Sequence, residues 1–432
     1  MVYFLWIFSN LRRGGVSAPK TRNRSQMQSA NTEQKPLVVI LSRNYSTGLG
    51  VIRQLGAKGY PVDLVASVKK SGSSVIASSS KYVRKSCEVR TENTVGDPGE
   101  SLADVLLSYA DEPGRKVLFP TDDFTASVAD RYRDRLSPIF VMPGVDEGFG
   151  FSLTDLMEKD RQMEMAKEEG LLTAATWEIS LAGDIAIPED MVYPCFVKPA
   201  RSIDGSKEEM AVCDSETVLA GHLLYLKDMY GSRNVLVQEY LPIDEEFDLS
   251  GACLGEDVII PAIIRKTRIA AYERGVTLAG EVVPAEILGD TLEKIKALMK
   301  RFRYTGMFDL EVHRVGETFY FNEANLRPGG PNFAYYLSGC NLPAAVTGYL
   351  LGYPREEEDE KVNGYGATFV YEKVAWEDYI HGYLRPAERD AVIKAADHGL
   401  LVWKEDPEPG KIFGKRIRLS AIKQTILRRR RR

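Results

Sequence analysis

Apolar positions in the first third of the chain form short runs separated by amphipathic stretches. The runs that are typical of buried β-strands are PLVVIL (36–41), YPVDLVA (60–66) and KVLFP (116–120). Helical stretches are expected between them, through Lys58 and again over 102–109. Because predicted strands and helices alternate, residues 36–145 are expected to form an α/β domain with a parallel sheet.

The pattern changes after about residue 150. A helix with one charged face is predicted over 158–170, and a series of strands follows. The predicted strands are 176–179, 195–200, 210–213, 234–241, 247–254, 257–265 and 316–324. Their lengths and turn spacing are typical of antiparallel pairs, so residues 146–352 are expected to form an α+β domain. Residues 353–432 are expected to form a small C-terminal module with a few strands and one short helix near 386–398.

Composition adds that the 432-residue chain is an ordinary globular protein, with 44% hydrophobic and 27% charged residues. Residues 1–35 are expected to be a flexible leader, and Met27 is an alternative start. The apolar stretch 1–8 is shorter than the roughly 20 residues needed to cross a bilayer, so no membrane partner is expected, although an anchor role stays open.

Charge and cysteine content limit which kinds of binding partner and which cellular compartment are expected. The net charge of −5 gives no general case for nucleic-acid binding, so the partners are expected to be small molecules. The arginine run 428–432 is interpreted as a solvated, frayed terminus, with contact to an acidic surface as the alternative. Five cysteines lie far apart without a CxxC pair, which favours a reduced, cytoplasmic location. The oligomeric state is open, and a homo-oligomer is possible.

Candidate metal ligands lie on a predicted hairpin over 306–330. Residues two apart on a strand share a face, so Asp309 lies beside Glu311 on one arm and Glu323 beside Asn325 on the other. Three carboxylates and an amide oxygen are the hard ligands that Mg²⁺ prefers, and Mn²⁺ is a possible substitute. Without a cation the carboxylates would raise each other's pKa. The alternative is a hairpin with a solvated polar face.

Three further features point to phosphate and nucleotide chemistry, each with a structural alternative. Lys198 ends a buried strand, where a lysine needs an anion or must reach out to solvent. The small-residue loop 200–209 is either a surface connection or a lid over phosphates. Its candidate ligand groups are Ser202, Gly205 and Ser206. The segment 235–251 is either an exposed acidic loop or a hinge that offers backbone groups to an adenine edge.

Taken in order, these elements resemble the ATP-grasp superfamily over about residues 37–351. The matching elements are Lys159 in EKDR, Lys198 in FVKPA, the hinge QEYL (238–241), Glu246, and the E-x-N end of the hairpin (323–325). The first domain resembles the pre-ATP-grasp domain. The run 325–343 is similar to the carboxylate-amine ligase branch, which includes D-aspartate ligases. A dinucleotide-binding domain is not favoured, because the first loop lacks GxGxxG spacing.

The resemblance implies a role for each matching residue. Lys159 and Lys198 would contact the phosphates of ATP, and Glu246 would bind the ribose. The hinge residues Gln238, Glu239, Tyr240 and Leu241 would meet adenine. Glu311, Glu323 and Asn325 would hold magnesium, with Asp309 as the alternative first ligand. The basic positions that would neutralise the transferred phosphoryl group or clamp the substrate carboxylate are Arg265 and Arg327.

The resemblance also implies a reaction. The protein would use ATP to phosphorylate a carboxylate to an acyl phosphate, then join it to an amine with release of ADP and phosphate. Two alternatives remain open: a carboxylase of the same fold that uses bicarbonate, and a non-catalytic regulator that binds nucleotides.

Overall fold

A five-stranded parallel sheet in the order β3-β2-β1-β4-β5 organises the first part of the chain. The computed structural model describes residues 35–43, 45–69, 74–91, 97–200 and 209–430, with side chains as far as Gln424. The strands are β1 (Leu37–Ser42), β2 (Val62–Val68), β3 (Val83–Arg90), β4 (Lys116–Pro120) and β5 (Phe140–Val141). The parallel sheet is therefore confirmed, although β3 was missed because it is mostly polar and only Val89 in it is buried, so it shows neither an apolar run nor a regular alternation.

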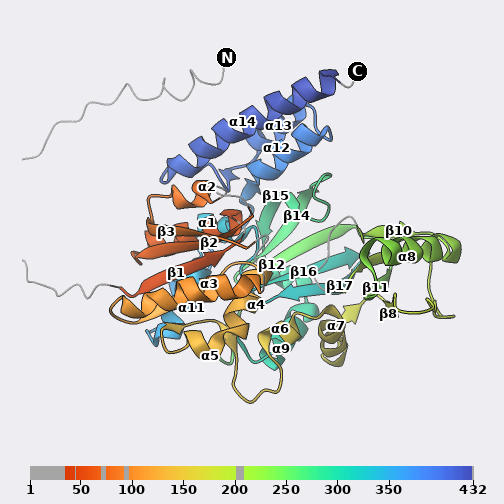
Figure 1. Cartoon of the computed structure of the whole chain (residues 1–432), viewed down its shortest axis with the longest axis horizontal. Coiled ribbons are helices and arrows are strands. Elements are labelled where there is room, and N and C mark those ends of the chain that lie inside the picture. The colour runs from red at the N-terminus through yellow and green to blue at the C-terminus, as the bar shows by residue number, and fades with distance from the viewer. Residues whose placement is uncertain (1–34, 44, 70–73, 92–96, 201–208, 431–432) are drawn as a thin grey trace, which may run out of the picture. The chain divides into compact units, whose positions relative to one another are not determined.

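Alternation along β1 explains how helices cover both faces of this sheet. Val38 and Ile40 share a core with helices α1, α10 and α11, whereas Val39 and Leu41 share another with α3 and α4. These helices are α1 (Tyr45–Ala57), α3 (Pro98–Leu107), α4 (Asp123–Arg131), α10 (Asn332–Leu337) and α11 (Leu342–Leu351). The short helices α2 (Val75–Ser78) and α5 (Arg133–Leu136) complete this region (Figure 1).

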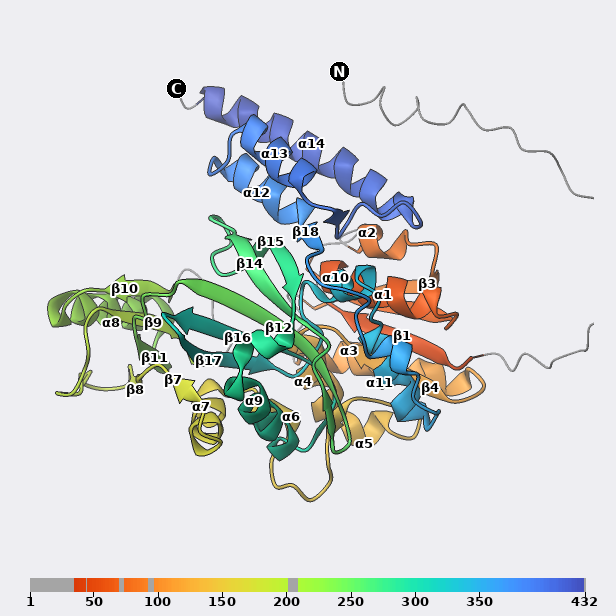
Figure 2. The same cartoon turned by 180° about the vertical axis from the view of Figure 1, so that it is seen from behind.

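A second sheet is antiparallel and has the order β10-β9-β11-β8. Its elements are β8 (Thr176–Ser180), β9 (Cys195–Pro199), β10 (Ala211–Cys213) and β11 (Asn234–Glu239), together with α8 (Glu216–Tyr230). Leu219, Leu223 and Leu226 of α8 pack on the strand side chains. In both views this lobe stands beside the ends of the central strands β16 and β17 (Figures 1 and 2).

The largest sheet joins segments from most of the chain. Its main path runs β19-β18-β15-β14-β12-β16-β17-β7, with β13 beside β12 and β6 beside β16. The strands are β6 (Gly144–Val145), β7 (Leu172–Thr173), β12 (Glu245–Leu254), β13 (Asp257–Ile259), β14 (Ile263–Ile269), β15 (Thr277–Val283), β16 (Tyr304–Val315), β17 (Thr318–Asn325), β18 (Thr368–Val370) and β19 (His398–Gly399). The helices α6 (Leu153–Leu156), α7 (Lys159–Glu168) and α9 (Asp290–Arg301) share the core on one of its faces. The predicted mixture of a parallel α/β part and an antiparallel part is confirmed.

The C-terminal region is more helical than the sequence pattern suggested. Besides the expected α13 (Pro386–Ala395), it contains α12 (Glu372–His381) and the long α14 (Pro407–Arg430). The interpretation of 428–432 as a frayed terminus is therefore wrong for residues up to 430, whose backbone continues α14. Among the described residues, no helix is long and apolar enough to cross a membrane.

A buried ion pair fastens this region to the first sheet. Arg53 of α1 donates from Nε to Asp406 Oδ2 at 3.0 Å, and both side chains are almost completely buried. The same guanidinium donates to the carbonyl oxygens of Leu400 and Leu401. Asp406 also accepts from Ser80 Oγ at 2.8 Å. One carboxylate therefore binds both α1, through Arg53, and the turn that follows α2, through Ser80.

Candidate active site

The hairpin of β16 and β17 has the register that the sequence pattern requires. Asp309 lies opposite Asn325, and Glu311 lies opposite Glu323. An irregularity after Glu311 shifts the pairing of the next residues. On the other side of β16, strand β12 places Asp248 opposite Glu311. The register therefore brings these five polar residues to one part of the central sheet.

Glu323 is held by a lysine from α7. The Nζ atom of Lys159 lies 2.6 Å from Glu323 Oε2, and the amide of Asn325 donates to Glu323 Oε1 at 3.4 Å. Burial alone would raise the pKa of Glu323, but Lys159 and Lys198 outweigh it and hold the pKa well below its usual range. Glu323 is therefore an anion at any physiological pH.

Lys266 of β14 neutralises a second group of carboxylates. Its Nζ atom lies 3.0 Å from Asp248 Oδ1, 3.2 Å from Glu246 Oε2 and 3.4 Å from Glu311 Oε1. Burial disfavours the charged lysine, but Glu311, Asp248 and Glu246 outweigh it and raise the pKa of Lys266 well above its usual value. The predicted ribose ligand Glu246 thus shares a cation with the predicted metal ligand Glu311.

Arg327 links the hairpin to helix α4. It donates from Nε to Asp123 Oδ1 at 2.9 Å and from Nη1 to Asp309 Oδ2 at 3.2 Å. Burial raises the pKa of Asp309 to about 7, although Arg327 opposes the shift. A Cβ atom on Gly329 would lie 2.0 Å from Asp309 Oδ1, so only glycine allows this close approach.

Lys159, Lys266 and Arg327 each pair with carboxylates, whereas Lys198 at the end of β9 does not pair with any described residue. It is buried, and its amino group has no ion pair or hydrogen bond with any residue that the structure describes. Burial and the nearby Lys159 lower the pKa of Lys198 to about 7, against the attraction of Glu323 and Glu311. A buried cation without a counter-ion is costly unless an anion binds to it. The geometry therefore offers Lys198 to an anionic ligand.

Within the described residues, the hinge after β11 leaves one backbone donor without an acceptor. The N–H group of Glu239 donates to Ala175 O at 2.8 Å, and that of Tyr240 donates to Pro194 O at 3.0 Å. The described part of the chain supplies no acceptor for the N–H group of Leu241. Gln238 is buried and donates to Thr176 Oγ1 at 3.0 Å. The hinge can therefore present Leu241 N–H to a ligand edge.

Not every residue predicted for the site lies in this cluster. Arg265 forms ion pairs with Glu281 at 2.5 Å and Glu245 at 3.8 Å, and the structure does not bring it to the carboxylates. Its neighbour Lys266 lies among them instead, because successive strand residues point to opposite faces. The lid residues Ser202, Gly205 and Ser206 lie outside the described residues.

Sequence reasoning also missed other members of the cluster. They are Asp123, Asp248, Lys266 and His313. Burial lowers the pKa of His313 to about 4, so its ring is neutral at pH 7. A local signal existed only for Asp248, which follows Glu246 by two residues on the same strand face.

The donor set fits a magnesium ion in its chemistry. Carboxylate and amide oxygens are the ligands that Mg²⁺ prefers, and Glu311, Glu323 and Asn325 lie at neighbouring register positions. Within the described ranges, no group of three or more His, Cys, Asp and Glu residues is arranged to hold a metal by itself. Lys159, Lys266 and Arg327 occupy the carboxylates, so a metal would have to share them with these cations.

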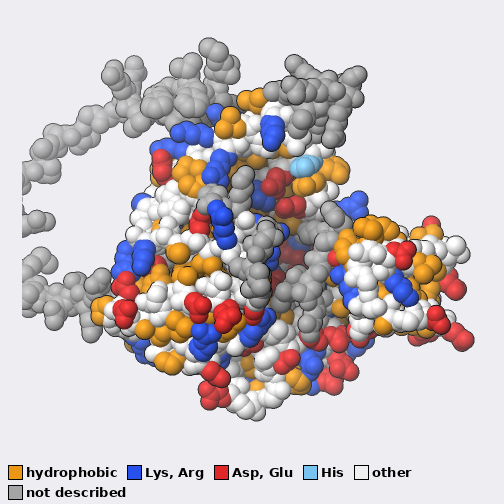
Figure 3. Space-filling model, in the orientation of Figure 1, with side chains coloured by type: hydrophobic (Ala, Val, Ile, Leu, Met, Phe, Trp, Pro, Cys, Tyr) orange, Lys and Arg blue, Asp and Glu red, His pale blue; other side chains and the backbone are white. Residues whose placement is uncertain are grey.

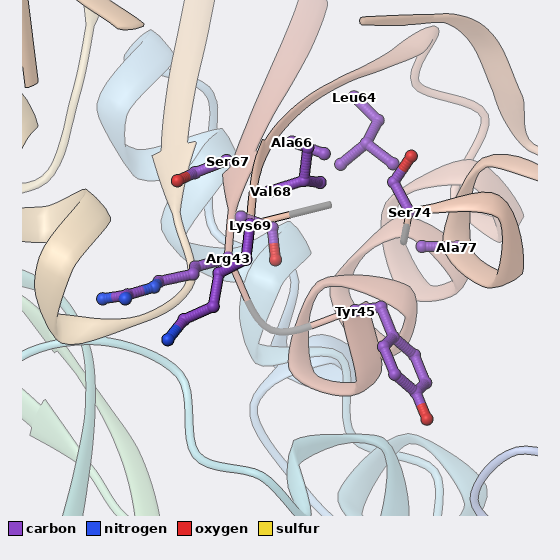
Figure 4. A pocket seen from close by; sticks show the side chains of 10 residues that line it. Arg43, Tyr45, Leu64, Ala66, Ser67, Val68, Lys69, Ser74 and Ala77 are labelled. Carbon is purple, nitrogen blue, oxygen red and sulfur yellow. The ribbon is translucent and has the colours of Figure 1, made fainter. Parts of the chain in front are cut away.

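A cavity of about 310 Å³ opens at the carboxyl ends of β1 and β2. Its lining residues are Ser42, Arg43, Tyr45, Leu64, Ala66, Ser67, Val68, Lys69, Ser74 and Ala77. Figure 4 shows Arg43 and Lys69 extending in the same direction, away from Leu64 and Ser74. The cavity thus combines an apolar wall with two cationic side chains.

The first residues of α4 connect this cavity to the carboxylate cluster. The N–H group of Arg43 donates to Asp122 Oδ2 at 2.6 Å, and its guanidinium lies 5.1 Å from the ring centre of Phe124. Asp123, between these two residues, binds Arg327. The consecutive residues 122–124 therefore contact Arg43, which lines the cavity, and also Arg327 of the carboxylate cluster.

Comparison with known proteins agrees with this architecture. No family model matches the chain. The chain is 24% identical over 321 residues to the D-aspartate ligase of Enterococcus faecium, a match that covers 61% of this chain and 74% of that protein. It is 23% identical over 164 residues to the carbamoyl phosphate synthase large chain of Lachnoclostridium phytofermentans, and it spans only 15% of that protein's length.

Solved structures resemble the chain over most of its length. The L-amino acid ligase from Bacillus licheniformis matches with a TM-score of 0.57 at 15% identity, over 77% of this chain and 78% of that chain. The biotin carboxylase domain of the Hydrogenobacter thermophilus 2-oxoglutarate carboxylase, solved with MgADP, ADP and bicarbonate, matches with a TM-score of 0.56 at 17% identity, over 76% and 73%. The expected fold is confirmed: the chain has an ATP-grasp fold.

The unpaired lysine gives a prediction that needs no ligand. Lys198→Met should stabilise the nucleotide-free protein by about 2–4 kcal/mol at pH 7, because the folded-state pKa of about 7 lies below the unfolded value of about 10.4. Between these two pH values the unfolded chain holds more protons, so the lysine's penalty shrinks as the pH rises. Urea denaturation at pH 7 and pH 9 measures the difference.

The control for this prediction is Lys300→Met, which changes an exposed lysine at the end of α9. It should alter stability by less than about 0.5 kcal/mol at either pH. A Lys198→Met protein that is less stable than the parent, or whose stability difference from the parent is the same at pH 7 and pH 9, would show that Lys198 is already compensated.

Proposed function

We propose that the protein is an ATP-dependent ligase, which phosphorylates a carboxylate to an acyl phosphate and condenses it with an amine, releasing ADP and phosphate. The observation that carries the proposal is Lys198, a buried amino group that has no partner among the described residues and lies beside Lys159 and Glu323. A polyphosphate would supply an anion to Lys198 and would share Lys159 with Glu323. The ligase fold of the solved relatives supports the same chemistry.

The nucleotide would lie between the two antiparallel sheets. Lys159 and Lys198 would bind its phosphates, and the N–H group of Leu241 would donate to the adenine edge. Glu239 and Tyr240 would position this hinge through their bonds to Ala175 and Pro194, with Gln238 bonded behind them. Glu246, steadied by Lys266, would accept from ribose hydroxyls.

Magnesium would be held by Glu311, Glu323 and Asn325. Asp309 is the less suitable ligand for two reasons. Its pKa is raised to about 7, so the carboxylate is partly protonated near neutral pH, and Arg327 already pairs with it. When bound, the ion would neutralise charge on the phosphate oxygens and lower the barrier to phosphoryl transfer. The donor chemistry suits Mg²⁺ and would also accept Mn²⁺.

The chain's own residues would position the reactants and stabilise charge. Arg327, fixed by Asp123 and Asp309, is placed to attract the carboxylate that attacks the terminal phosphoryl group. Attack by a carboxylate oxygen forms the acyl phosphate and releases ADP. The amine then attacks the acyl carbon, phosphate leaves, and the amine loses a proton to complete the amide.

The cavity beside Arg43 is the proposed place for one substrate. Its two cations suit a carboxylate, and its apolar wall suits a short side chain, so an amino acid fits both. The names of two relatives, a D-aspartate ligase and an L-amino acid ligase, agree with amino acids as substrates.

Arg43→Gln tests this placement. It should raise the KM of one substrate by about tenfold to a hundredfold, the loss expected for one charge-assisted contact. The KM of ATP should stay within about twofold, because Arg43 does not contact the proposed nucleotide residues. Steady-state kinetics with each substrate varied in turn measures both. An equal rise in both KM values would contradict the placement.

Identification of the products tests the function itself. The protein would be mixed with ATP, Mg²⁺ and pools of amino and carboxylic acids, and ADP, phosphate and condensed products would be followed by mass spectrometry. Release of AMP and pyrophosphate would reject the acyl-phosphate route. ADP formation that depends on bicarbonate would identify a carboxylase, and ATP binding without turnover in any pool would identify a regulator.

A further inference from the structure

Beyond Ile417, as far as Gln424, α14 presents a surface that the rest of the described residues leave uncovered. The helix packs through its first turns on α2 and α12, where Phe413 is buried and Ile417 is half-buried. Beyond that point Leu419 is 68% exposed and Ile422 is 57% exposed. These two residues are three apart and therefore share one face of the helix.

The same face is strongly basic. Lys415 and Lys423 each lie four residues from Leu419, and Arg418 lies four residues from Ile422. All three cations are exposed, and none forms an ion pair with a carboxylate among the described residues. Figure 3 shows Lys and Arg side chains along the edge of the molecule where α14 lies.

Charge along the sequence is equally one-sided. From residue 409 onward the chain has ten Lys and Arg residues and no Asp or Glu, although the whole chain has a net charge of −5. The segment that follows Ile422 includes Ile426 and Leu427 before the arginine run 428–432. Such asymmetry within one protein is typical of segments that bind a polyanionic surface.

We propose that residues 415–424, the distal segment of α14, dock the protein on a bilayer that contains anionic phospholipids. Charge complementarity brings the basic face to the headgroups, and Leu419 and Ile422 enter the boundary with the acyl chains. A nucleic acid would satisfy the cations but would leave these two aliphatic side chains in water. Over residues 415–424 no aromatic side chain is available to stack on bases.

The geometry of the fold suits this mode of binding. The ion pair of Arg53 with Asp406 fixes the segment just before α14, while Phe413 fixes its first turns. The helix then runs past α12 toward the C-terminus in both views (Figures 1 and 2). The distal segment can therefore lie along a surface without unpacking the core.

Sedimentation of the full-length chain with lipid vesicles tests the proposal. The protein should bind vesicles of phosphatidylcholine mixed with phosphatidylserine, and binding should weaken as salt is added. The variant Lys415→Gln/Arg418→Gln/Lys423→Gln should bind about tenfold to a hundredfold more weakly. The variant Leu419→Gln/Ile422→Gln should bind about tenfold more weakly at unchanged charge.

A matched control removes three exposed lysines from α7 and α9 through Lys167→Gln, Lys294→Gln and Lys300→Gln. This control should bind like the parent, and all variants should keep the parent's melting temperature, because the changed side chains lie on the surface. No binding to the mixed vesicles would overturn the proposal. Equal loss in the control, no loss in the aliphatic variant, or preferential binding of single-stranded RNA would overturn it as well.

Discussion

Glu323→Gln should reduce ATP-dependent turnover by about a thousandfold or more, the loss expected when a charged group that acts on a transferred phosphoryl is removed. Glutamine keeps the shape of the side chain but loses the charge that pairs with Lys159 at 2.6 Å. The same charge favours the protonated form of Lys198 and would bind magnesium in the proposed site. Release of ADP and phosphate from the best substrate pool measures the effect.

Two further proteins separate chemistry from folding. Glu317→Gln changes an exposed glutamate in the turn of the same hairpin and should leave turnover within about twofold of the parent. Lys159 is left unpaired in Glu323→Gln, so the double variant Lys159→Met/Glu323→Gln should recover stability but not activity. Turnover that survives in Glu323→Gln would remove the hairpin from the proposed mechanism.

Asp406→Asn should destabilise the protein by about 3–5 kcal/mol, because it leaves the buried Arg53 charge without its counter-ion. Burial lowers the pKa of Arg53, and Asp406 opposes that shift. The asparagine can still meet Ser80, but it cannot replace the negative charge. Equilibrium urea denaturation measures the change, and limited proteolysis should show earlier cleavage in the C-terminal region.

Glu405→Gln provides the matched control, because Glu405 is the exposed neighbour of Asp406. It should change stability by less than about 0.5 kcal/mol. A loss below about 1 kcal/mol in Asp406→Asn would show that the carbonyl oxygens of Leu400 and Leu401 suffice to hold Arg53.

The sequence predicted most of the strands for a simple physical reason. Strands β1 and β4 are buried on both faces, so their residues form continuous apolar runs with clear limits. The helix α8 was missed although Leu219, Leu223 and Leu226 are buried, because the exposed Leu224 and Met229 blur its apolar stripe. The helix α14 has too few buried residues to show a stripe at all.

Site residues could be predicted to lie together where they belong to the same strand. Alternation placed Asp309 beside Glu311 and Glu323 beside Asn325, and the observed register agrees. The cation Lys266 was not predictable, because only the pairing of β12 with β14 brings it to Glu246. Arg265 and Lys266 are adjacent cations that point to opposite faces, and no local pattern says which of them faces the carboxylates.

Transfer of a labelled oxygen tests the central claim most directly. The protein would be incubated with ATP, Mg²⁺ and amino acids whose carboxylate oxygens carry a heavy isotope, in unlabelled water. If an acyl phosphate forms, one labelled oxygen passes to the released phosphate for each amide made, and the nucleotide product is ADP. Unlabelled phosphate with unchanged ligation, or AMP with pyrophosphate, would contradict the account.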